Sequence, residues 1–281
     1  MLTLLALFAC QAPTTETDTG VVDTSDSGTL PTAEVITAVT FNAESGDAMD
    51  WKVAESISPV VGEALWGMEE VQNQGWADTF AAAAADGSHQ HFSQVLGTTG
   101  GADKLLILYD DFRLDLLSSE ELSAINVGGT ARAPLLAHFR TLEGGTEFLF
   151  MVNHLWRSDA DKRHQQSQML HDWALQQTLP VLMVGDFNID WAVIDGDNNH
   201  DVGYDLIVAD DAWKWVRPDT IIRTQCNAYY DSVLDFGFVS GEAQSWESSS
   251  VILEERESYC ATDNAAKSDH RPVQTTLTLP L

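Results

Sequence analysis

Short stretches of apolar and alternating residues follow one another from about residue 35 to the end of the chain. Their β-branched and aromatic content predicts strands. We place these strands at 35–41, 64–71, 91–96, 105–109, 135–141, 147–153, 179–184, 220–224, 233–240, 249–253 and 273–279. Gly144 and Gly145 separate two of them and predict a hairpin.

Three segments instead carry apolar residues at helical spacing and predict helices at 49–61, 76–85 and 159–177. Ser158 or Asp159 can cap the third of these helices. Strands mixed with helices, with a hairpin among them, predict an α/β fold of sheets covered by helices. A chain of 281 residues that is 44% apolar can bury one large core. No break interrupts the pattern after residue 35, so one domain over 35–281 is the simplest organisation.

The first 34 residues have a different composition. Residues 1–10 are apolar and end in Leu7-Phe8-Ala9-Cys10, which looks like a bacterial lipoprotein signal. The segment is short and has no preceding Lys or Arg, so a frayed apolar terminus or a misassigned start codon is the alternative. It is too short to span a membrane as a helix, which takes ~20 apolar residues. Residues 11–34 predict a disordered acidic linker. We therefore expect an exported monomer, either lipid-anchored through Cys10 or secreted.

The charge balance limits the substrates that the protein can attract. The chain has 14 basic and 43 acidic residues, a net charge of −29. Such a surface repels polyanions and excludes DNA binding through many lysines and arginines. A nucleic-acid substrate would need to be held locally, by a metal ion and a few cations.

The cysteine count leaves two possibilities. If Cys10 is lipidated, Cys226 and Cys260 remain as an even pair, and a disulfide between them fits an oxidising compartment. The alternative is two unrelated buried thiols, because the sequence supplies no distance.

Polar residues stand at the ends of several apolar strands. In Gly185-Asp186-Phe187-Asn188, the side chains of Asp186 and Asn188 are two residues apart and project to one face. Gly185 permits close approach of a backbone or a ligand. In Ser268-Asp269-His270-Arg271-Pro272, a carboxylate and an imidazole are neighbours, as ester hydrolysis with a metal requires. Alone, each string is more often a turn or a solvated loop.

Four further stretches place one polar group at a strand end or within an apolar strand. They are Asn42, Glu70 in Met68-Glu69-Glu70-Val71, Asn153-His154-Leu155, and Leu234-Asp235-Phe236. Taken singly, each fits a cap, a turn or a satisfied core polar group.

All six stretches, in this order, resemble the endonuclease/exonuclease/phosphatase family of DNase I-like nucleases, abasic-site endonucleases, sphingomyelinases and inositol polyphosphate phosphatases. The resemblance spans roughly residues 35–281. It implies a four-layer sandwich of two packed mixed β-sheets flanked by helices, with the site at one end of the sheets. Glu69 departs from the pattern, because the family has Gln there. The change would add a negative charge beside the metal.

The resemblance also implies a role for each residue. Glu70 would be the principal ligand of Mg²⁺ or Mn²⁺, with Asn42 and Asp269 near the same ion or a second one. His270 would be a general base or a phosphate-stabilising acid, with Asp235 fixing its tautomer. The remaining roles would be orientation of the attacking water by Asp186, and phosphate contacts by Asn188 and His154. Asp103 lies near the position of a carboxylate that supports the first histidine, but we leave it outside the site.

Three hypotheses about function follow. The first is a metal-dependent phosphodiesterase that cleaves extracellular nucleic acid by in-line attack of water. The runner-up is a phospholipid head-group hydrolase resembling sphingomyelinases, or a small-molecule phosphatase. A membrane-active enzyme would expose an aromatic pair, for which Trp213 and Trp215 are candidates unless they form half of a buried strand. The third is a silent surface-binding module, which the complete set of polar residues argues against.

Overall fold

The structure of the protein is a computed structural model. It describes residues 33–88, 91–227, 230–253, 260 and 266–280. The predicted signal segment with Cys10, and all but the last two residues of the predicted linker, lie outside the described residues. Those two residues, Ala33 and Glu34, belong to the first strand.

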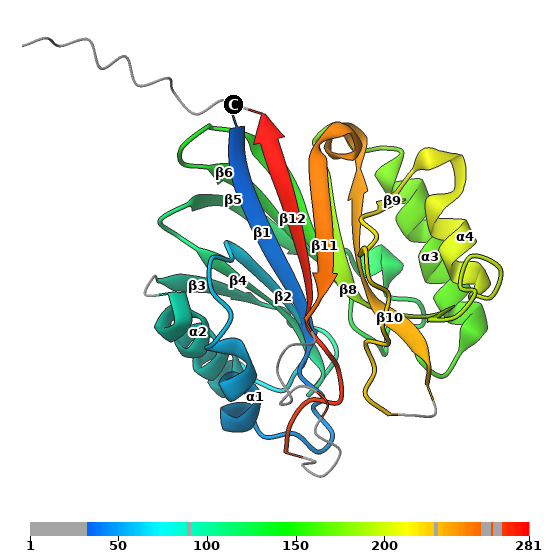
Figure 1. The fold of residues 1–281 in the computed structure, drawn as a ribbon, viewed down its shortest axis with the longest axis horizontal. Helices are drawn as coiled ribbons and strands as arrows, with labels where there is room; N and C mark the ends of the chain where they lie inside the picture. The colour runs from blue at the N-terminus through cyan, green and yellow to red at the C-terminus, as the bar shows by residue number, and fades with distance from the viewer. Residues whose placement is uncertain (1–32, 89–90, 228–229, 254–259, 261–265, 281) are drawn as a thin grey trace, which may run out of the picture. The chain divides into compact units, whose positions relative to one another are not determined.

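Two six-stranded mixed sheets form the centre of the fold (Figure 1). The first sheet has the order β11-β12-β1-β2-β4-β3. Its strands are β1 Ala33–Asn42, β2 Leu65–Val71, β3 Phe92–Leu96, β4 Lys104–Asp110, β11 Glu247–Ile252 and β12 Val273–Pro280. The second sheet has the order β5-β6-β7-β8-β10-β9. Its strands are β5 Leu114–Glu121, β6 Leu135–Thr141, β7 Glu147–His154, β8 Val181–Ala192, β9 Lys214–Trp215 and β10 Ser232–Ser240.

Helices cover the outer faces of both sheets (Figure 1). The helices α1 Asp50–Ile57 and α2 Gln74–Ser88 lie beside the first sheet, and α3 Ala160–Ala174 and α4 Val202–Val208 lie beside the second. Asp159 caps α3, because its carboxylate accepts a hydrogen bond from the backbone N–H of Lys162 at 3.1 Å. The α/β four-layer sandwich expected from the sequence is confirmed. None of the helices in the described ranges has the length and hydrophobicity that a membrane crossing requires.

Apolar side chains fill the space between the layers. Phe150 and Leu182 of the second sheet pack with Ile36, Ile107 and Leu277 of the first, and all five are almost completely buried. A second apolar cluster lies beneath α3 and α4, and a third beneath α1 and α2. This packing on both faces holds the strands in a fixed register. The polar residues at the strand ends therefore have fixed positions relative to one another.

Three sequence expectations were wrong in detail. The segment 220–224 forms no strand, although the next residue, Gln225, makes an isolated bridge to His270. The helix expected at 49–61 ends at Ile57, two residues before Pro59, which has no backbone N–H to continue the helical hydrogen bonds. Trp51, assigned to its apolar face, is 58% exposed. β5 and α4 were not predicted from the sequence, because they are short or have little apolar periodicity.

Candidate active site

The register of the second sheet brings three predicted site residues together. His154 at the end of β7 is paired with Asp186 in β8, and Asp186 is paired with Asp235 in β10. Directly opposed residues on neighbouring strands project from the same face of a sheet. The three side chains are 4% exposed or less. The strand pairing therefore creates a buried polar row.

Gly185 allows β8 to pass close to β7. Its φ is 147°, and a Cβ atom there would lie 2.0 Å from the backbone oxygen of Asn153. No residue with a side chain fits this position without a shift of the backbone. The prediction that Gly185 permits a close approach is confirmed, and the approaching group is backbone. Glu70 and Asn188 also have positive φ values, 58° and 51°. Such conformations are strained in residues other than glycine, and they concentrate at functional sites.

The first sheet contributes Asn42 and Glu70 to the same place. The side-chain amide of Asn42 donates hydrogen bonds to Oδ2 of Asp186 at 3.0 Å and to Oε1 of Glu70 at 3.2 Å. The other carboxylate oxygen of Glu70 accepts hydrogen bonds from the backbone and the hydroxyl of Ser45, both at 3.0 Å. The oxygen of the Asn42 amide accepts from the backbone N–H of Glu44. In this arrangement Asn42 orients the two carboxylates and turns its N–H groups, not its oxygen, toward them.

His270 lies just before β12 and completes the group. Its Nδ1 donates to Oδ2 of Asp235 at 2.9 Å, and its Nε2 lies 3.8 Å from Oδ2 of Asp186. The hydroxyl of Ser268 accepts from the backbone N–H of His270 and donates to the backbone oxygen of Asn42. Ser268 thus links the segment before β12 to the end of β1, and this link fixes the position of the His270 imidazole in the pocket.

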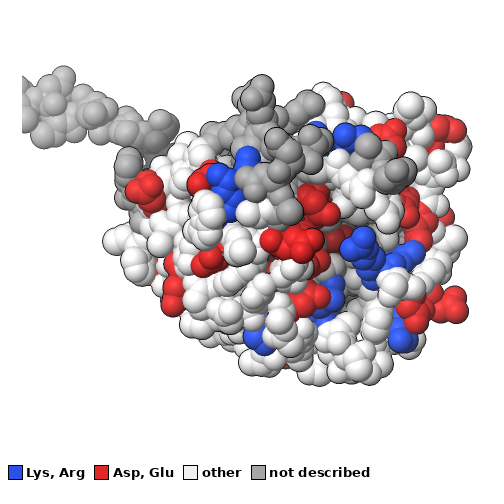
Figure 2. Space-filling model, turned by 90° about the horizontal axis from the view of Figure 1, so that it is seen from below, with Lys and Arg blue, Asp and Glu red and all other residues white. Residues whose placement is uncertain are grey.

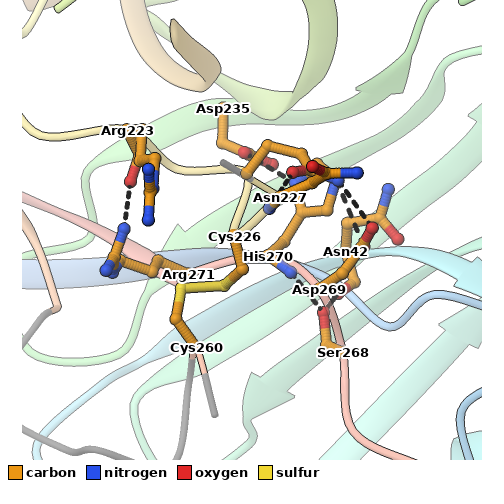
Figure 3. Close-up of a disulfide and its surroundings, with 11 residues drawn as sticks. Asn42, Arg223, Cys226, Asn227, Asp235, Cys260, Ser268, Asp269, His270 and Arg271 are labelled. Carbon is orange, nitrogen blue, oxygen red and sulfur yellow. Dashed lines mark hydrogen bonds and ion pairs between the residues drawn. A yellow bond between two sulfur atoms is a disulfide. The ribbon is translucent and has the colours of Figure 1, made fainter. Parts of the chain in front are cut away.

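The neighbouring Asp269 is held by a residue that the sequence did not single out. The side-chain amide of Gln225 donates to Oδ2 of Asp269 at 2.6 Å, and the backbone N–H of Cys226 donates to its backbone oxygen at 2.6 Å. Cys226 is joined to Cys260 by a disulfide, so the expected pairing is present (Figure 3). The disulfide thus ties together two loops beside Asp269 and His270. Gln225 stands outside every motif, and only its proximity in space reveals it.

His154 has a carboxylate partner, Asp103, on the side of its ring that faces away from Asp186. Asp103 Oδ1 lies 3.8 Å from Nδ1 of His154, and Asp103 also pairs with Arg132 at 2.7 Å. Nε2 of His154 faces Oδ2 of Asp186 at 3.5 Å and Oε1 of Glu70 at 3.9 Å. The structure therefore places Asp103 at the site, although the sequence argument left it out.

The two histidines differ in their affinity for a proton. Burial lowers the pKa of His154 well below its usual value, and the nearby charge of Arg132 lowers it further. Burial also acts to lower the pKa of His270, but the charge and hydrogen bond of Asp235, with Asp186 and Asp269, raise it well above the usual value. The site therefore offers one neutral imidazole and one that favours the protonated form.

Burial raises the pKa values of several carboxyl groups in the site, and neighbouring carboxylates add to the shift. Burial, followed by the charge of Asp235, raises the pKa of Asp186 to about 7. Burial and the charge of Asp269 raise the pKa of Glu44 to about 7, and burial raises that of Asp103 to about 6. Crowded acids of this kind are stabilised by a bound cation, and carboxylate oxygens are the ligands that Mg²⁺ and Mn²⁺ prefer. Among the described residues, two groups offer ligand atoms close enough together to hold such an ion: Glu70 with Asp103 and His154, and Asp186 with Asp235 and His270.

Glu69, where the family has Gln, lies close enough to Asp235 and Asp186 for their charges to act on it. Its side chain is fully buried beneath the site and accepts a hydrogen bond from the hydroxyl of Thr40 at 2.9 Å. Burial, and secondarily the charge of Asp235, raises its pKa well above the usual value. Glu69 thus favours the uncharged form. The expectation that it adds a negative charge was wrong, because burial disfavours its charged form.

Eight predicted site residues thus meet in one region. A cavity of about 500 Å³ is lined by Glu70, His154, Asp186, Asn188, Asp269 and His270, while Asn42 and Asp235 contact these residues from behind. Figure 2 views the molecule from this end, where acidic side chains gather near the middle of the face and basic ones are scattered around them. A cavity of this size suits a small or single-stranded ligand.

The fold is shared with solved structures. An endonuclease/exonuclease/phosphatase family protein from Bacteroides thetaiotaomicron is 18% identical, with a TM-score of 0.65 over 89% of this chain and 99% of that one. A mannosyl-6-phosphatase from the same organism is 17% identical, with a TM-score of 0.62 over 86% and 99%. D. rerio TDP2 in complex with a single-stranded DNA product is 13% identical, with a TM-score of 0.65 over 87% and 99%.

The chain therefore has the DNase I-like fold of the endonuclease/exonuclease/phosphatase proteins. No known protein-family model and no curated protein sequence matches it. At these identities the likeness establishes the fold, and the chemistry depends on the site itself.

Proposed function

We propose that the protein is a divalent-metal-dependent hydrolase of phosphate esters. The observation that carries this proposal is the convergence of three residues on one oxygen. Oδ2 of Asp186 lies 3.0 Å from the amide of Asn42, 3.5 Å from Nε2 of His154 and 3.8 Å from Nε2 of His270. These residues come from both sheets. A carboxylate between two imidazoles, beside further acids, is suited to hydrolysis of a phosphate ester.

Each protein group has a task in this reaction. Asp186, with a pKa of about 7, can orient an attacking water and accept its proton near neutral pH. His270, protonated and held by Asp235, stabilises the negative charge that grows on the phosphate oxygens. His154 and Asn188 contact the phosphate from the other side of the pocket. A divalent ion held by Glu70 and Asp269 would supply further charge stabilisation.

The pocket and the charge of the chain favour small or single-stranded esters over duplex nucleic acid. The cavity measures about 500 Å³ and is lined by five acidic residues. With a net charge of −29, the chain cannot attract a long polyanion by charge alone. Within the nuclease hypothesis, we therefore expect a single strand or a strand end as the substrate.

The aromatic pair that a membrane-active enzyme would expose is not formed by the two candidates. Trp213 is 2% exposed and Trp215 is 7% exposed, and both pack in the core beneath α3 and α4. The alternative of half of a buried strand describes Trp215, which lies in β9. The two tryptophans therefore do not support a phospholipid head-group as the substrate. Of the two runner-up substrates, a small-molecule phosphate ester is now favoured.

We also propose that the protein acts outside the cytoplasm, anchored by a lipid on Cys10. The disulfide between Cys226 and Cys260 supports this, because such bonds persist in oxidising compartments. Membrane fractionation of the expressing cells tests the anchor. Wild-type protein should sediment with membranes, and the Cys10→Ala variant should not. Equal distribution of the two would contradict the anchor without affecting the proposed chemistry.

The experiment for the catalytic proposal is a product analysis with Mg²⁺ or Mn²⁺. The substrates are p-nitrophenyl phosphate, bis(p-nitrophenyl) phosphate, a single-stranded DNA oligonucleotide and sphingomyelin. We expect metal-dependent turnover of at least one ester, lost by ~100-fold or more in Asp186→Ala. Asp115→Ala is the matched control, because Asp115 is half-exposed and pairs with Arg140. Equal activity of the Asp186→Ala variant and the wild type would contradict the mechanism.

A further inference from the structure

The wall of the pocket contains a basic residue that belongs to none of the six motif stretches. Arg157 follows β7 after Leu155 and Trp156, and it lines the cavity together with Tyr230. Both side chains are exposed to solvent, Tyr230 by 39%. Arg157 and Tyr230 belong to the active site already described, because Glu70, Asp269 and His270 line the same cavity.

Among the described residues, two arginines line this cavity, and they are used differently. Arg163 is buried, and its guanidinium pairs with Asp201 at 2.7 Å. It also donates to the backbone oxygens of Trp156 and Arg157, at 2.9 and 3.1 Å. The charge of Arg163 is thus neutralised, and its contacts hold the backbone of Arg157 in place.

The guanidinium of Arg157 has a different kind of partner. It interacts with the side chain of Tyr230. This interaction, with the charges of Asp269 and Glu70, outweighs burial and raises the pKa of Arg157. A phenol orients a guanidinium without neutralising it. Since Asp269 and Glu70 are the candidate metal ligands, the positive charge lies on the side of the pocket where the reacting phosphate would bind.

The charge of the substrate decides how useful this arginine is. A phosphate monoester carries a charge of about −1.5 to −2 at pH 7, whereas a diester carries a single negative charge. The second charge is costly beside Glu44, Glu70, Asp186, Asp190 and Asp269, which all line the cavity. A guanidinium can bind two phosphate oxygens at once and offset that cost.

We propose that Arg157, oriented by Tyr230, binds the non-bridging oxygens of the reacting phosphate and makes the protein prefer phosphate monoesters to diesters. This inference rests on the proposed phosphoesterase function and narrows its substrate class. It makes Arg157 a residue that determines specificity, beside the groups that carry out the hydrolysis.

The first test compares kcat/KM for p-nitrophenyl phosphate and bis(p-nitrophenyl) phosphate in the wild type and in Arg157→Gln. We expect the monoester-to-diester ratio to fall by at least ~10-fold, as for loss of a charged hydrogen-bonding pair. Arg157→Lys, which keeps the charge but not the planar fork, should recover part of the ratio. Arg140→Gln removes the same charge on β6, outside the cavity, and should leave the ratio unchanged. An equal fall for both esters, or no fall, would overturn the proposal.

The second test measures binding of inorganic phosphate by calorimetry at pH 8, with Mn²⁺ and with a chelator. We expect ~10-fold weaker binding in Arg157→Gln under both conditions. Equal affinity of the two proteins would overturn the phosphate contact. If the wild type hydrolyses neither ester but the affinity still falls, the proposed function fails and the anion-binding role of Arg157 stands.

Discussion

The floor and the rim of the pocket are built in different ways. We define the floor as His154, Asp186, Asp235 and His270, which are all 6% exposed or less. The rim consists of Glu44, Arg157, Gln225, Tyr230 and Asp269, which lie in loops. Strand register sets three of the floor residues, and Asp235 and Ser268 hold His270 against them. Single hydrogen bonds and one disulfide hold the rim. The difference suggests that the floor fixes the chemistry and the rim selects the substrate.

The largest expected effect comes from the floor. In His270→Gln we expect hydrolysis to slow by ~10²- to 10⁴-fold, the usual contribution of a positioned acid or base. The rate is measured at saturating Mg²⁺ or Mn²⁺. His138→Gln is the matched control, because His138 is a partly exposed residue of β6 that pairs with Glu147. A rate within a few-fold of wild type would remove His270 from the mechanism.

Asp235→Asn sharpens the same test through the pH profile. Asp235 raises the pKa of His270 by its charge and its hydrogen bond, so its loss should lower that pKa. The limb of the rate profile that reports His270 should then move to lower pH, whichever protonation state is active. An unmoved limb would assign it to another group.

A smaller effect is expected at the rim, from the double variant Cys226→Ser and Cys260→Ser. Loss of a disulfide across a separation of 34 residues should lower the free energy of unfolding by about 2–4 kcal/mol. Affinity for Mn²⁺ should also fall several-fold, because Asp269 loses the anchor of its neighbouring loop. Denaturant titration and calorimetry measure the two quantities.

Asp115→Ala is the control for this double variant, since Asp115 is an exposed residue of β5 that pairs with Arg140 and lies outside the disulfide. Unchanged Mn²⁺ affinity in the double variant would show that the rim does not depend on the disulfide. A lost His270 limb in the pH profile would show instead that rim and floor are not separable.

The smallest effect is expected beneath the floor, in Glu69→Gln. Because burial raises the pKa of Glu69, the folded protein retains a proton that the unfolded chain releases above pH ~4. Folding is therefore penalised increasingly as the pH rises above that value. Glu69→Gln should be more stable than wild type at pH 8, on the order of 1 kcal/mol, and the two should converge near pH 4.

Denaturant titrations at pH 4 and pH 8, with intact disulfide, test this expectation. The hydroxyl of Thr40 can still donate to the amide oxygen of the introduced Gln, so the packing is preserved. Lower stability of Glu69→Gln at pH 8 would mean that a charged Glu69 contributes favourably to the folded state.

The sequence predicted the floor well, because three floor residues stand on strands with a strong apolar pattern and His270 lies just before another such strand, β12. Asp186 follows four apolar residues, and Asp235 lies within an apolar strand. Once such strands pair in register, their polar residues meet, so a linear pattern carries the spatial information. The same apolar patterns also predicted nearly all of the strands.

Apart from Asp269, the rim escaped prediction because its contacts join loops that are distant in the sequence. Gln225 contacts Asp269, 44 residues away, and nothing in the local pattern around Gln225 announces this. Arg157 and Tyr230 likewise meet only in the fold. The segment 220–224 was wrong as a strand because its apolar residues, Ile221 and Ile222, pack against the core beneath α3 and α4 from a loop.

The central claim is that residues from both sheets surround one divalent cation. A crystal soaked with Mn²⁺ tests it most directly, through the position of the anomalous scattering peak. We predict a strong peak in contact with the carboxylate of Glu70, inside the cavity that also contains Asp186 and Asp269. A peak elsewhere, or none at millimolar Mn²⁺, would contradict the account.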